Sequence, residues 1–431
     1  MRILEIVHGY PPKYNAGSEN YTEAVTNELS KRGHEVSVFC REENQFQPEF
    51  DLQETTTLKD SKISKYVVNA ARIKDRFLNS RIDQTLEEII EKFHPDIAHI
   101  EHLNHLSLGI PKVLKDRGIP IVYTLHDFWL MCPRGQFLQF NLDGEPWRNC
   151  DGQEDIKCAT ICYARYQTGD PDSNMDFNYW TSWVTTRMDY ARRAVDYIDK
   201  FIAPSQTVMK AFVNSFPEAS GKVSYLDYGF DLSKLEKRER ICESPFFVFG
   251  YIGTHIPAKG IDYLLRAFGR VNGNALLRIW GRAIGEFTPY LKVLSLEIEK
   301  VSGNRVEWMG EFDGNMMMEQ VFNKVDAIVV PSIWLENSPL VIHEAQQARV
   351  PVITADMGGM AEYVKHEING LLFKFRNVDS LAKQMQGILD NPLIATKLGQ
   401  KGYLYTENGD VQSIEVHVER LIEIFKSLSG K

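Results

Sequence analysis

The stretch that decides the fold is VVPSIWLENSPLVIHE, which spans residues 329–344. It starts at the end of the apolar run 326–330, whose length and β-branched residues are typical of a buried parallel strand. We expect this strand to stop at Pro331, Ser338 to cap the next helix, and Pro339 to occupy the first helical position. A strand followed closely by a capped helix predicts an open α/β sheet.

Two carboxylates flank this helix start. Glu336 lies in the loop, and Glu344 lies about a turn and a half into the helix. Open α/β sheets usually bind ligands in the crevice at the carboxyl ends of their strands. Helix N–H groups there suit a phosphate, and carboxylates suit the hydroxyls of a sugar or ribose. The alternative is that both are ordinary solvated carboxylates beside a well-capped helix.

The composition is that of a globular protein with more than one domain. The chain has 431 residues, 43% hydrophobic and 25% charged, which predicts two domains. Its formal net charge of −9 argues against a nucleic-acid partner. No apolar stretch approaches the ~18 residues of a membrane span, and residues 1–7 resemble a first strand rather than a signal peptide. We therefore expect a cytoplasmic protein with mostly reduced cysteines.

The chain opens with a strand at residues 2–7, a helix capped near Ser18 or Asn20 that continues to Lys31, and a second strand at residues 35–40. This pattern lacks the G-x-G-x-x-G spacing of dinucleotide-binding proteins, which weakens the prediction of a hydride-transfer enzyme. Gly17, at the start of the helix, either lets the backbone approach a phosphate or serves only the turn. His126 follows the strand 120–125, where it would either contact a sugar hydroxyl at the functional edge or be structural.

Residues 59–81 carry seven basic and two acidic residues around an apolar side. Such a segment is either a solvated helix face or a peripheral contact with the anionic inner face of a membrane. Both interpretations remain open on the sequence alone.

Four of the six cysteines fall within a polar, turn-rich segment at about residues 128–165, namely Cys132, Cys150, Cys158 and Cys162. Clustered thiolates in a cytoplasmic protein suggest a structural Zn²⁺ site, which would fold a segment with little core of its own. The C-x₃-C pair fits such a site, whereas the gaps of 17 and 7 residues do not match a standard zinc ribbon. Reduced thiols and a disulfide pair are the alternatives.

A charged stretch without a strand pattern, residues 231–245, is expected to link two domains. The first domain would span residues 1–230, and a second doubly wound domain would span residues 246–405. Residues 406–431 would carry a final amphipathic helix that packs back on the first domain.

Two further features of the second domain suit an anion. Lys259 stands just before a helix that starts near Ile261, and an ammonium group beside helix N–H groups makes an anion site. Gly358 and Gly359 precede another helix. Together with residues 329–344, these features predict a pocket for a diphosphate.

The motifs, taken in order, resemble a known family. They are PP-x₃-AGSE, GHEV, TLHD, GYIG-x₅-KG, PS-x₃-E-N-x-P-x₄-E-A and GG-x₂-E-x₄-E-x-x-G-L-L. The set covers nearly the whole chain and closely resembles the retaining GT-B glycosyltransferases of family 4, and the E-x₇-E spacing of Glu336 and Glu344 is its most specific part. The resemblance implies two facing Rossmann-like domains, of which the second binds a nucleotide-diphosphate sugar and the first a carbohydrate or lipid-linked acceptor. The implied role is the synthesis of a cell-surface polysaccharide, glycolipid or glycoconjugate.

The resemblance also implies a role for each matching residue. Glu344 would bind the ribose hydroxyls, Glu336 the donor sugar, and His126 the sugar during its transfer. Lys259 would hold the diphosphate and neutralise its charge, so that no cofactor is required for catalysis. Gly17 would approach the diphosphate from the first domain. The other donor-binding positions are Thr254, Asn337, Ser338, Pro339 and Leu340.

Two positions depart from the pattern of the family. Thr254 stands where members usually carry Arg, which removes one expected cation, and His255 is a candidate to replace it. Ala16 and Gly17 replace the usual glycine pair, and the extra methyl group crowds the approach of a phosphate. A sugar-nucleotide epimerase, a phosphorylase of the same architecture and a non-catalytic carbohydrate-binding protein are the alternative functions.

Overall fold

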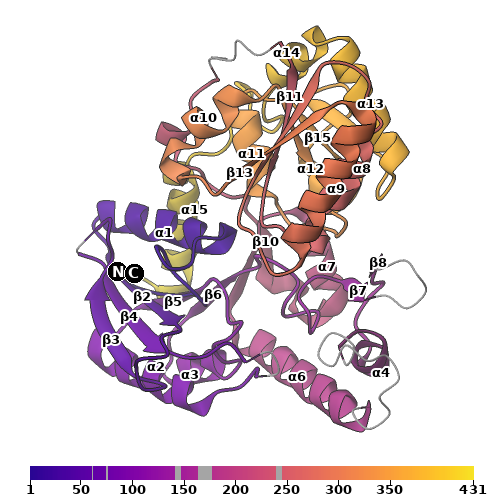
Figure 1. The fold of residues 1–431 in the computed structure, drawn as a ribbon. Helices are drawn as coiled ribbons and strands as arrows, with labels where there is room; N and C mark the ends of the chain where they lie inside the picture. Colours follow the sequence, from indigo (N-terminus) through magenta and orange to yellow (C-terminus); the bar gives the residue numbers. More distant parts are fainter. Residues whose placement is uncertain (61, 74–75, 141–146, 164–176, 239–244) are drawn as a thin grey trace. The chain divides into compact units, whose positions relative to one another are not determined.

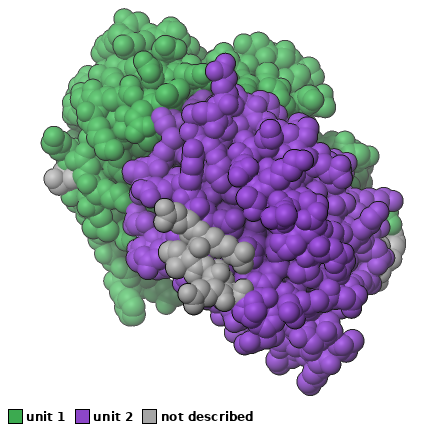
Figure 2. Space-filling view, turned by 90° about the horizontal axis from the view of Figure 1, so that it is seen from above, with its two compact units in different colours: residues 1–229, 414–431 green, residues 230–413 purple. Residues whose placement is uncertain are grey.

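The computed structural model contains two compact units, each built on its own sheet (Figure 1). The structure describes residues 1–60, 62–73, 76–140, 147–163, 177–238 and 245–431. Unit 1 comprises residues 1–229 and 414–431, and unit 2 comprises residues 230–413 (Figure 2). The prediction of two α/β domains with doubly wound parallel sheets is confirmed.

Unit 1 is built on an eight-stranded sheet in the order β10-β9-β6-β5-β1-β2-β4-β3. Its strands are β1 (Arg2–Ile6), β2 (Glu35–Glu42), β3 (Leu52–Thr56), β4 (Ser64–Asn69), β5 (Ile97–Ile100), β6 (Ile121–Thr124), β9 (Lys200–Ala203) and β10 (Val223–Tyr225). Every pairing is parallel except the antiparallel edge pair β3–β4. The central strands are short, buried and mostly apolar, as the interior of a parallel sheet requires.

The order of the strands in unit 1 reverses at β1. From β1 the chain first builds β2 and β4 on one side and then β5 and β6 on the other. A reversal of this kind opens a crevice at the carboxyl ends of β1 and β5. The main helices of unit 1 are α1 (Gly17–Lys31), α2 (Ser80–Phe93), α3 (Ile110–Asp116), α6 (Phe177–Tyr197), α7 (Gln206–Ser215) and α15 (Ile414–Ser429).

The last helix, α15, packs against α1 inside unit 1. The Tyr21 hydroxyl lies 2.6 Å from Nε2 of His417, and Nδ1 of His417 lies 2.8 Å from the carbonyl oxygen of Asp227. Gly229 approaches so closely that a Cβ there would lie 2.4 Å from Cβ of His417. The two ends of the chain lie side by side in unit 1 (Figure 1).

Unit 2 is built on a six-stranded, fully parallel sheet in the order β13-β12-β11-β14-β15-β16. Its strands are β11 (Phe247–Ile252), β12 (Ala275–Trp280), β13 (Arg305–Gly310), β14 (Ala327–Val330), β15 (Val352–Ala355) and β16 (Gly370–Phe373). Its helices are α8 (Ile261–Phe268), α9 (Phe287–Ser302), α10 (Met317–Gln320), α11 (Leu340–Gln347), α12 (Gly358–Tyr363), α13 (Val378–Asp390) and α14 (Leu393–Gly399). The strand order reverses between β11 and β14, so the ligand crevice of this sheet is expected at their carboxyl ends.

The unit boundaries differ from those expected. Residues 230–238 belong to unit 2 and contain the 3₁₀ turn η3 (Leu232–Lys234), so the described part of the expected linker 231–245 is not a separate segment. Residues 406–413 also belong to unit 2, because the N–H of Phe230 donates to the carbonyl oxygen of Gln412 at 2.9 Å. A charged, irregular sequence does not reveal such pairing with a segment far along the chain.

Residues 59–81 are not a helix face, because they contain strand β4, which pairs with β2 and β3. Lys59 forms an ion pair with Glu23 on α1. Nη1 of Arg76 lies 3.4 Å from Oε1 of Glu49. Acidic partners elsewhere in unit 1 thus balance part of this positive charge. None of the helices in the described part of the chain combines the length and hydropathy that a membrane span needs.

Candidate active site

Two loops of unit 2 meet at the carboxyl edge of its sheet. One follows β11 and contains the 3₁₀ turn η4 (Pro257–Lys259), and the other joins β14 to α11. The N–H of Ile333 donates to the carbonyl oxygen of Ala258 at 2.9 Å, which ties one loop to the other. Because β11 and β14 are neighbours at the reversal of strand order, this is the expected ligand site.

Lys259 and Glu336, which the sequence singled out separately, form an ion pair in these loops. Nζ of Lys259 lies 2.7 Å from Oε1 of Glu336, and the Ser332 hydroxyl donates to the same oxygen at 2.6 Å. The side chain of Glu336 is 7% exposed, whereas that of Lys259 is 30% exposed. The carboxylate is therefore fixed inside the loop, while the ammonium group is open to an anionic ligand.

The loop that carries Glu336 has an unusual backbone, held by the start of α12. Glu336 has a φ of 43°, in the left-handed region that residues other than glycine seldom adopt. The N–H of Gly359 donates to the carbonyl oxygen of Leu335 at 2.9 Å. A Cβ at Gly358 would lie 1.8 Å from the Leu335 oxygen, and one at Gly359 would lie 1.4 Å from the carbonyl oxygen of Asn337. The two glycines therefore allow the helix to approach the loop, and strain held in this way is typical of ligand sites.

Gly359→Ala is expected to lower both the stability of the protein and its affinity for an anionic ligand at this site. The new methyl group would collide with backbone atoms of the Glu336 loop, and overpacking of this kind costs about 1–3 kcal/mol. Gly387→Ala is the matched control, because Gly387 lies in α13 with nothing within 4 Å of its Cβ position, and this change should stabilise by about 0.5–1 kcal/mol. Urea denaturation and nucleotide titration measure both effects. Equal stability of the two variants would contradict the close approach.

The helix after this loop starts one residue later than predicted. α11 begins at Leu340, and Pro339 is its N-cap in an extended conformation without a side-chain cap, so the prediction that Ser338 caps the helix is wrong. Asn337 and Ser338 are buried. Pro339 ends the loop because its ring fixes φ and its nitrogen carries no hydrogen to donate.

Glu344 lies on the second turn of α11 and is partly buried. Burial raises the pKa of its carboxyl group to about 7, and the neighbouring His343 offsets this only in part. A carboxyl group with a pKa near neutrality, at the edge of a candidate ligand site, is a feature of functional positions.

His255 is a poor replacement for the positive charge of the arginine that the family usually carries at the position of Thr254. Thr254 follows β11, and its carbonyl oxygen accepts from the Tyr251 hydroxyl at 3.4 Å. His255 is buried, and its Nδ1 lies 3.2 Å from Oγ1 of Thr288. Burial and the nearby Lys292 lower its pKa, which disfavours His255 as a substitute for the missing cation near neutral pH.

In unit 1, His126 is held by hydrogen bonds at both ring nitrogens. Its Nε2 lies 2.7 Å from Oε2 of Glu101, and its Nδ1 lies 2.7 Å from the Tyr228 hydroxyl. His126 follows β6 and Glu101 follows β5, so neighbouring parallel strands place the two side chains together. The imidazole is therefore fixed at the carboxyl edge of the sheet, where the sequence placed it.

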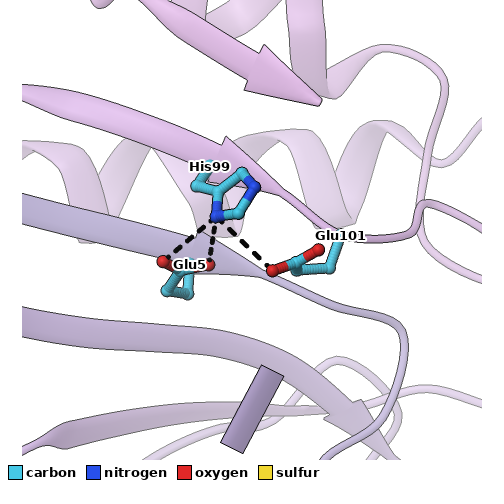
Figure 3. A group of neighbouring side chains, drawn as sticks. All are labelled: Glu5, His99 and Glu101. Carbon is cyan, nitrogen blue, oxygen red and sulfur yellow. Dashed lines mark hydrogen bonds and ion pairs between the residues drawn. The ribbon is translucent and has the colours of Figure 1, made fainter. Parts of the chain in front are cut away.

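Glu101 also belongs to a buried cluster with Glu5 on β1 and His99 on β5, whose side chains point toward one another (Figure 3). Nδ1 of His99 lies 3.0 Å from Oε2 of Glu5 and 3.4 Å from Oε1 of Glu101. Its Nε2 lies 2.8 Å from Oγ1 of Thr124. The three ligand atoms lie within 4.8 Å of one another, a spacing that a metal ion could also use.

The protonation of this cluster favours a hydrogen-bond network. Burial alone would lower the pKa of His99, but the carboxylates of Glu101 and Glu5 raise it to about 9. Burial would raise the pKa of Glu101, but His99 and His126 lower it, whereas burial raises the pKa of Glu5. These shifts favour the charged forms of His99 and Glu101 and the neutral form of Glu5, which reduces the net charge buried in the cluster.

Gly17 opens α1 at the same edge of the unit 1 sheet, after β1. The N-cap is Ala16, in an extended conformation and without a side-chain cap. Oε1 of Glu19 lies 3.3 Å from Nε2 of His8, which follows β1. Burial would raise the pKa of Glu19, but the hydrogen bond from His8 lowers it to about 2. The first turn of α1 is thus anchored to the carboxyl end of β1.

The four clustered cysteines lie in unit 1 between β6 and α6. This insertion contains the antiparallel strands β7 (Leu138–Phe140) and β8 (Trp147–Asn149), the short helix α4 (Asp155–Lys157) and the π-helix η1 (Cys158–Tyr163). Cys132 precedes β7, Cys150 follows β8, and Cys158 and Cys162 lie on η1. No disulfide joins any two of these four cysteines in the structure, and all four line one cavity.

The sequence interpretation missed the residues that hold His126. Glu101 directly follows the buried strand β5, and His126 lies two residues after β6, so a position at the end of a buried strand marks both residues. Tyr228 carries no such signal, because it follows the edge strand β10 at a distance that no motif marks. Glu5 and His99 lie inside strands, where a polar residue has no local pattern to identify it.

Comparison with protein families gives two matches that together span residues 16–424. The model described as Glycosyltransferase Family 4 matches residues 16–234, and the model described as Glycosyl transferases group 1 matches residues 234–424. Their boundary falls close to the boundary between units 1 and 2.

Curated relatives share part of the sequence. An uncharacterized glycosyltransferase of Methanocaldococcus jannaschii is 31% identical over 143 residues, which are 33% of this chain and 35% of that protein. The GDP-mannose-dependent alpha-(1-6)-phosphatidylinositol monomannoside mannosyltransferase of Mycobacterium tuberculosis is 28% identical over 231 residues, 49% of this chain and 58% of that protein. The chain thus spans about half the length of the curated relatives it matches, or less.

Solved structures share the fold over the whole chain. Sucrose-phosphate synthase of Thermosynechococcus elongatus matches with a TM-score of 0.70 at 17% identity, over 100% of this chain and 99% of that one. HepE of Anabaena, solved with UDP-glucose, matches with a TM-score of 0.67 at 17% identity, over 99% and 100% of the two chains. Since the family 4 model alone matches half of the sequence, the chain belongs to the glycosyltransferases of family 4.

Proposed function

We propose that the protein transfers a sugar from a nucleotide-diphosphate sugar to a hydroxyl group of a carbohydrate or lipid-linked acceptor, with retention of the anomeric configuration. The observation that supports this most is the Lys259–Glu336 pair at the reversal of strand order in unit 2. Lys259 would bind the diphosphate, Glu336 the donor sugar, and Glu344 the ribose hydroxyls. The other donor contacts would come from Thr254, Asn337, Ser338, Pro339 and Leu340. In unit 1, His126 would contact the transferred sugar and Gly17 the diphosphate.

The chemistry suits these residues. Breaking the bond between the sugar and the diphosphate builds negative charge on the leaving group and positive charge on the anomeric carbon. Fixed donors aimed at such charge usually make the largest single contribution to catalysis. Lys259 already pairs with Glu336, and the diphosphate would become its second anionic partner. The carboxylate of Glu336 accepts hydrogen bonds and so suits the hydroxyl groups of the sugar. An oxygen of the departing diphosphate would accept the proton of the acceptor, so we assign no protein residue as general base.

We also propose that catalysis is independent of metal ions, because Lys259 and helix N–H groups would neutralise the leaving group. The chain contains one Asp-x-Asp sequence, formed by Asp170 and Asp172, and carboxylates of this kind suit a divalent cation. This sequence lies outside the described residues. Transfer rates with a chelator and with added Mg²⁺ or Mn²⁺ test the proposal. Equal rates would support it, and a strict requirement for the ion would contradict it.

The names of the relatives guide the choice of substrates. The Mycobacterium tuberculosis protein is named for transfer from GDP-mannose to a phosphatidylinositol mannoside, and HepE was solved with UDP-glucose. A nucleotide sugar is therefore the donor to test, with glycan and lipid-linked acceptors.

Incubation with a panel of UDP-, GDP- and ADP-sugars tests the proposed function. We expect release of the nucleoside diphosphate from one of these donors, increased by a suitable acceptor, and a product with the anomeric configuration of the donor by NMR. An epimerase would change the sugar without releasing the diphosphate, and a phosphorylase would require inorganic phosphate. No turnover and no binding of any donor would favour a non-catalytic carbohydrate-binding protein.

Glu101→Gln is expected to lower kcat by about 10- to 150-fold, because the charged hydrogen bond that orients His126 contributes about 1.5–3 kcal/mol. The matched control is Glu5→Gln in the same buried cluster, where burial already favours the protonated carboxyl group. Kinetics and the NMR signals of the His126 ring nitrogens measure the effect. Equal losses in both variants, without a change at His126, would indicate a structural role only.

A further inference from the structure

The cysteines of the insertion come from four separate points of the chain and meet at one cavity. Cys132 precedes β7, Cys150 follows β8, and Cys158 and Cys162 begin and nearly end η1. They line the same cavity of about 20 Å³. A space of this size holds about one water molecule or one ion. Two residues four apart on one helical turn point to the same side, as the C-x₃-C pair does here.

Most hydrogen bonds of the thiols are long. Cys150 Sγ donates to the carbonyl oxygen of Gly152 at 2.9 Å and lies 3.8 Å from Gln139 Nε2 and 4.0 Å from Asp151 Oδ1. Cys162 Sγ accepts from Arg134 Nη1 at 3.6 Å and lies 3.9 Å from the carbonyl oxygen of Leu138. Cys132 and Cys158 are buried, and Cys150 and Cys162 are half-buried. A bound transition metal would deprotonate the thiols that ligate it.

The cations around the cavity would favour thiolates. Arg134 and Lys157 both line it, and Nζ of Lys157 also lies 2.7 Å from Oδ1 of Asp151. Four thiolates around one divalent ion carry a net negative charge, which Arg134 and Lys157 would offset in part.

The insertion also needs a cross-link that holds its short elements together. The structure describes two strands of three residues each, a three-residue helix and a six-residue π-helix in it. A two-stranded hairpin is marginal on its own in water. A cross-link among Cys132, Cys150, Cys158 and Cys162 would join the segment before β7, the end of β8 and η1, which is what a structural metal does in small segments.

We propose that Cys132, Cys150, Cys158 and Cys162 bind one Zn²⁺ ion that holds the insertion on unit 1. Four sulfur ligands select Zn²⁺ or iron, and a closed tetrahedral shell has a structural rather than a catalytic role. Among the described residues, three ligand atoms lie within 4.8 Å of one another at Glu5, His99 and Glu101. No three sulfur atoms of the four cysteines, all of which the structure describes, come this close to one another, so the cysteine side chains would have to rotate toward the cavity to bind a metal ion.

Metal analysis of the intact chain tests this proposal. Purified protein, or protein refolded with equimolar Zn²⁺ and dialysed, is expected to hold about one zinc ion per chain. Cys158→Ser and Cys162→Ser should lose most of this zinc. Cys40→Ser is the control, because Cys40 is buried in β2 outside the cluster and its loss should leave the zinc content unchanged.

A second measurement needs no variant. Alkylation of the wild-type chain should modify the four clustered thiols slowly when zinc is bound and quickly after a strong chelator removes it. A disulfide among the four, iron in place of zinc, or no retained metal would each overturn the proposal. So would full zinc content in folded Cys158→Ser protein. Because the readouts are metal content and thiol reactivity, they are independent of the proposed sugar transfer.

Discussion

Replacing Lys259 with alanine is expected to lower kcat/KM for sugar transfer by about 10²- to 10³-fold, the range for loss of one fixed donor to a developing oxyanion. Nζ of Lys259 is 2.7 Å from Glu336 and is partly exposed, so a diphosphate can reach it. Most of the loss should appear in kcat, because the negative charge of the leaving group grows toward the transition state. Steady-state kinetics with the donor found in the nucleotide-sugar panel measures this effect.

The control for Lys259→Ala separates chemistry from folding. The substitution leaves the carboxylate of Glu336 buried with the Ser332 hydroxyl as its described donor, which should cost about 1–3 kcal/mol of stability. The double variant Lys259→Ala, Glu336→Gln removes that buried charge and should regain stability but not activity. Wild-type activity in folded Lys259→Ala protein would show that this residue does not bind the diphosphate.

The second large effect is expected for Glu344→Gln, which should weaken the binding of the nucleotide sugar by about 10- to 150-fold. A hydrogen bond to a charged group contributes about 1.5–3 kcal/mol, and the amide keeps the shape of the carboxylate without its charge. Because the ribose takes no part in bond breaking, the loss should appear in KM and the dissociation constant rather than in kcat. Calorimetric titration of both proteins measures the change.

The affinity of the wild-type protein for a nucleotide sugar should also depend on pH through Glu344. Burial raises the pKa of this carboxyl group to about 7, and only the ionised form accepts hydrogen bonds from both ribose hydroxyls. Binding should therefore weaken about tenfold between about pH 8 and pH 6, and Glu344→Gln should lose this dependence. A doubly esterified diphosphate does not titrate in this range, so the donor itself does not contribute. The same pH dependence in both proteins would contradict the assignment.

Glu344→Gln should also stabilise the ligand-free protein. The folded-state pKa of about 7 lies above the ordinary value of 4.5, so the protein loses stability as the pH rises between these values. The cost above neutrality is at most on the order of 3 kcal/mol, since one pKa unit corresponds to about 1.4 kcal/mol, and partial exposure of Glu344 reduces it. Glu344→Gln should therefore raise the midpoint of thermal unfolding at alkaline pH but not at about pH 4. Loss of stability at every pH would indicate a structural carboxylate.

Local patterns in the sequence predicted most of the fold. β14 and α11 lie where the apolar run and the helical spacing of residues 329–344 place them, within one or two residues. Lys259, Glu336 and Glu344 were identified as candidates because they stand at the ends of strands and the starts of helices. The pairing of Lys259 with Glu336 was not predicted, because it depends on the left-handed backbone at Glu336 and on the closeness of two loops.

The remaining features depend on contacts between distant segments. Glu101 and His126 are 25 residues apart and meet only because β5 and β6 pair in parallel. The basic residues at 59–81 suggested an exposed helix, but acidic residues on other elements offset part of their charge. Spacing along the chain does not show which opposite charges the fold brings together.

The central claim is that unit 2 binds a nucleoside diphosphate through Lys259 and the loop that carries Glu336. Calorimetric titration of the intact chain with UDP, GDP and ADP tests it most directly. We predict that one of the three binds with one nucleotide per chain and that the Gly387→Ala control retains this binding. Lys259→Ala should weaken it strongly, because the free diphosphate already carries the negative charge that the donor develops only in the transition state. No heat with any of the three nucleotides, or unchanged binding by folded Lys259→Ala protein, would contradict the claim.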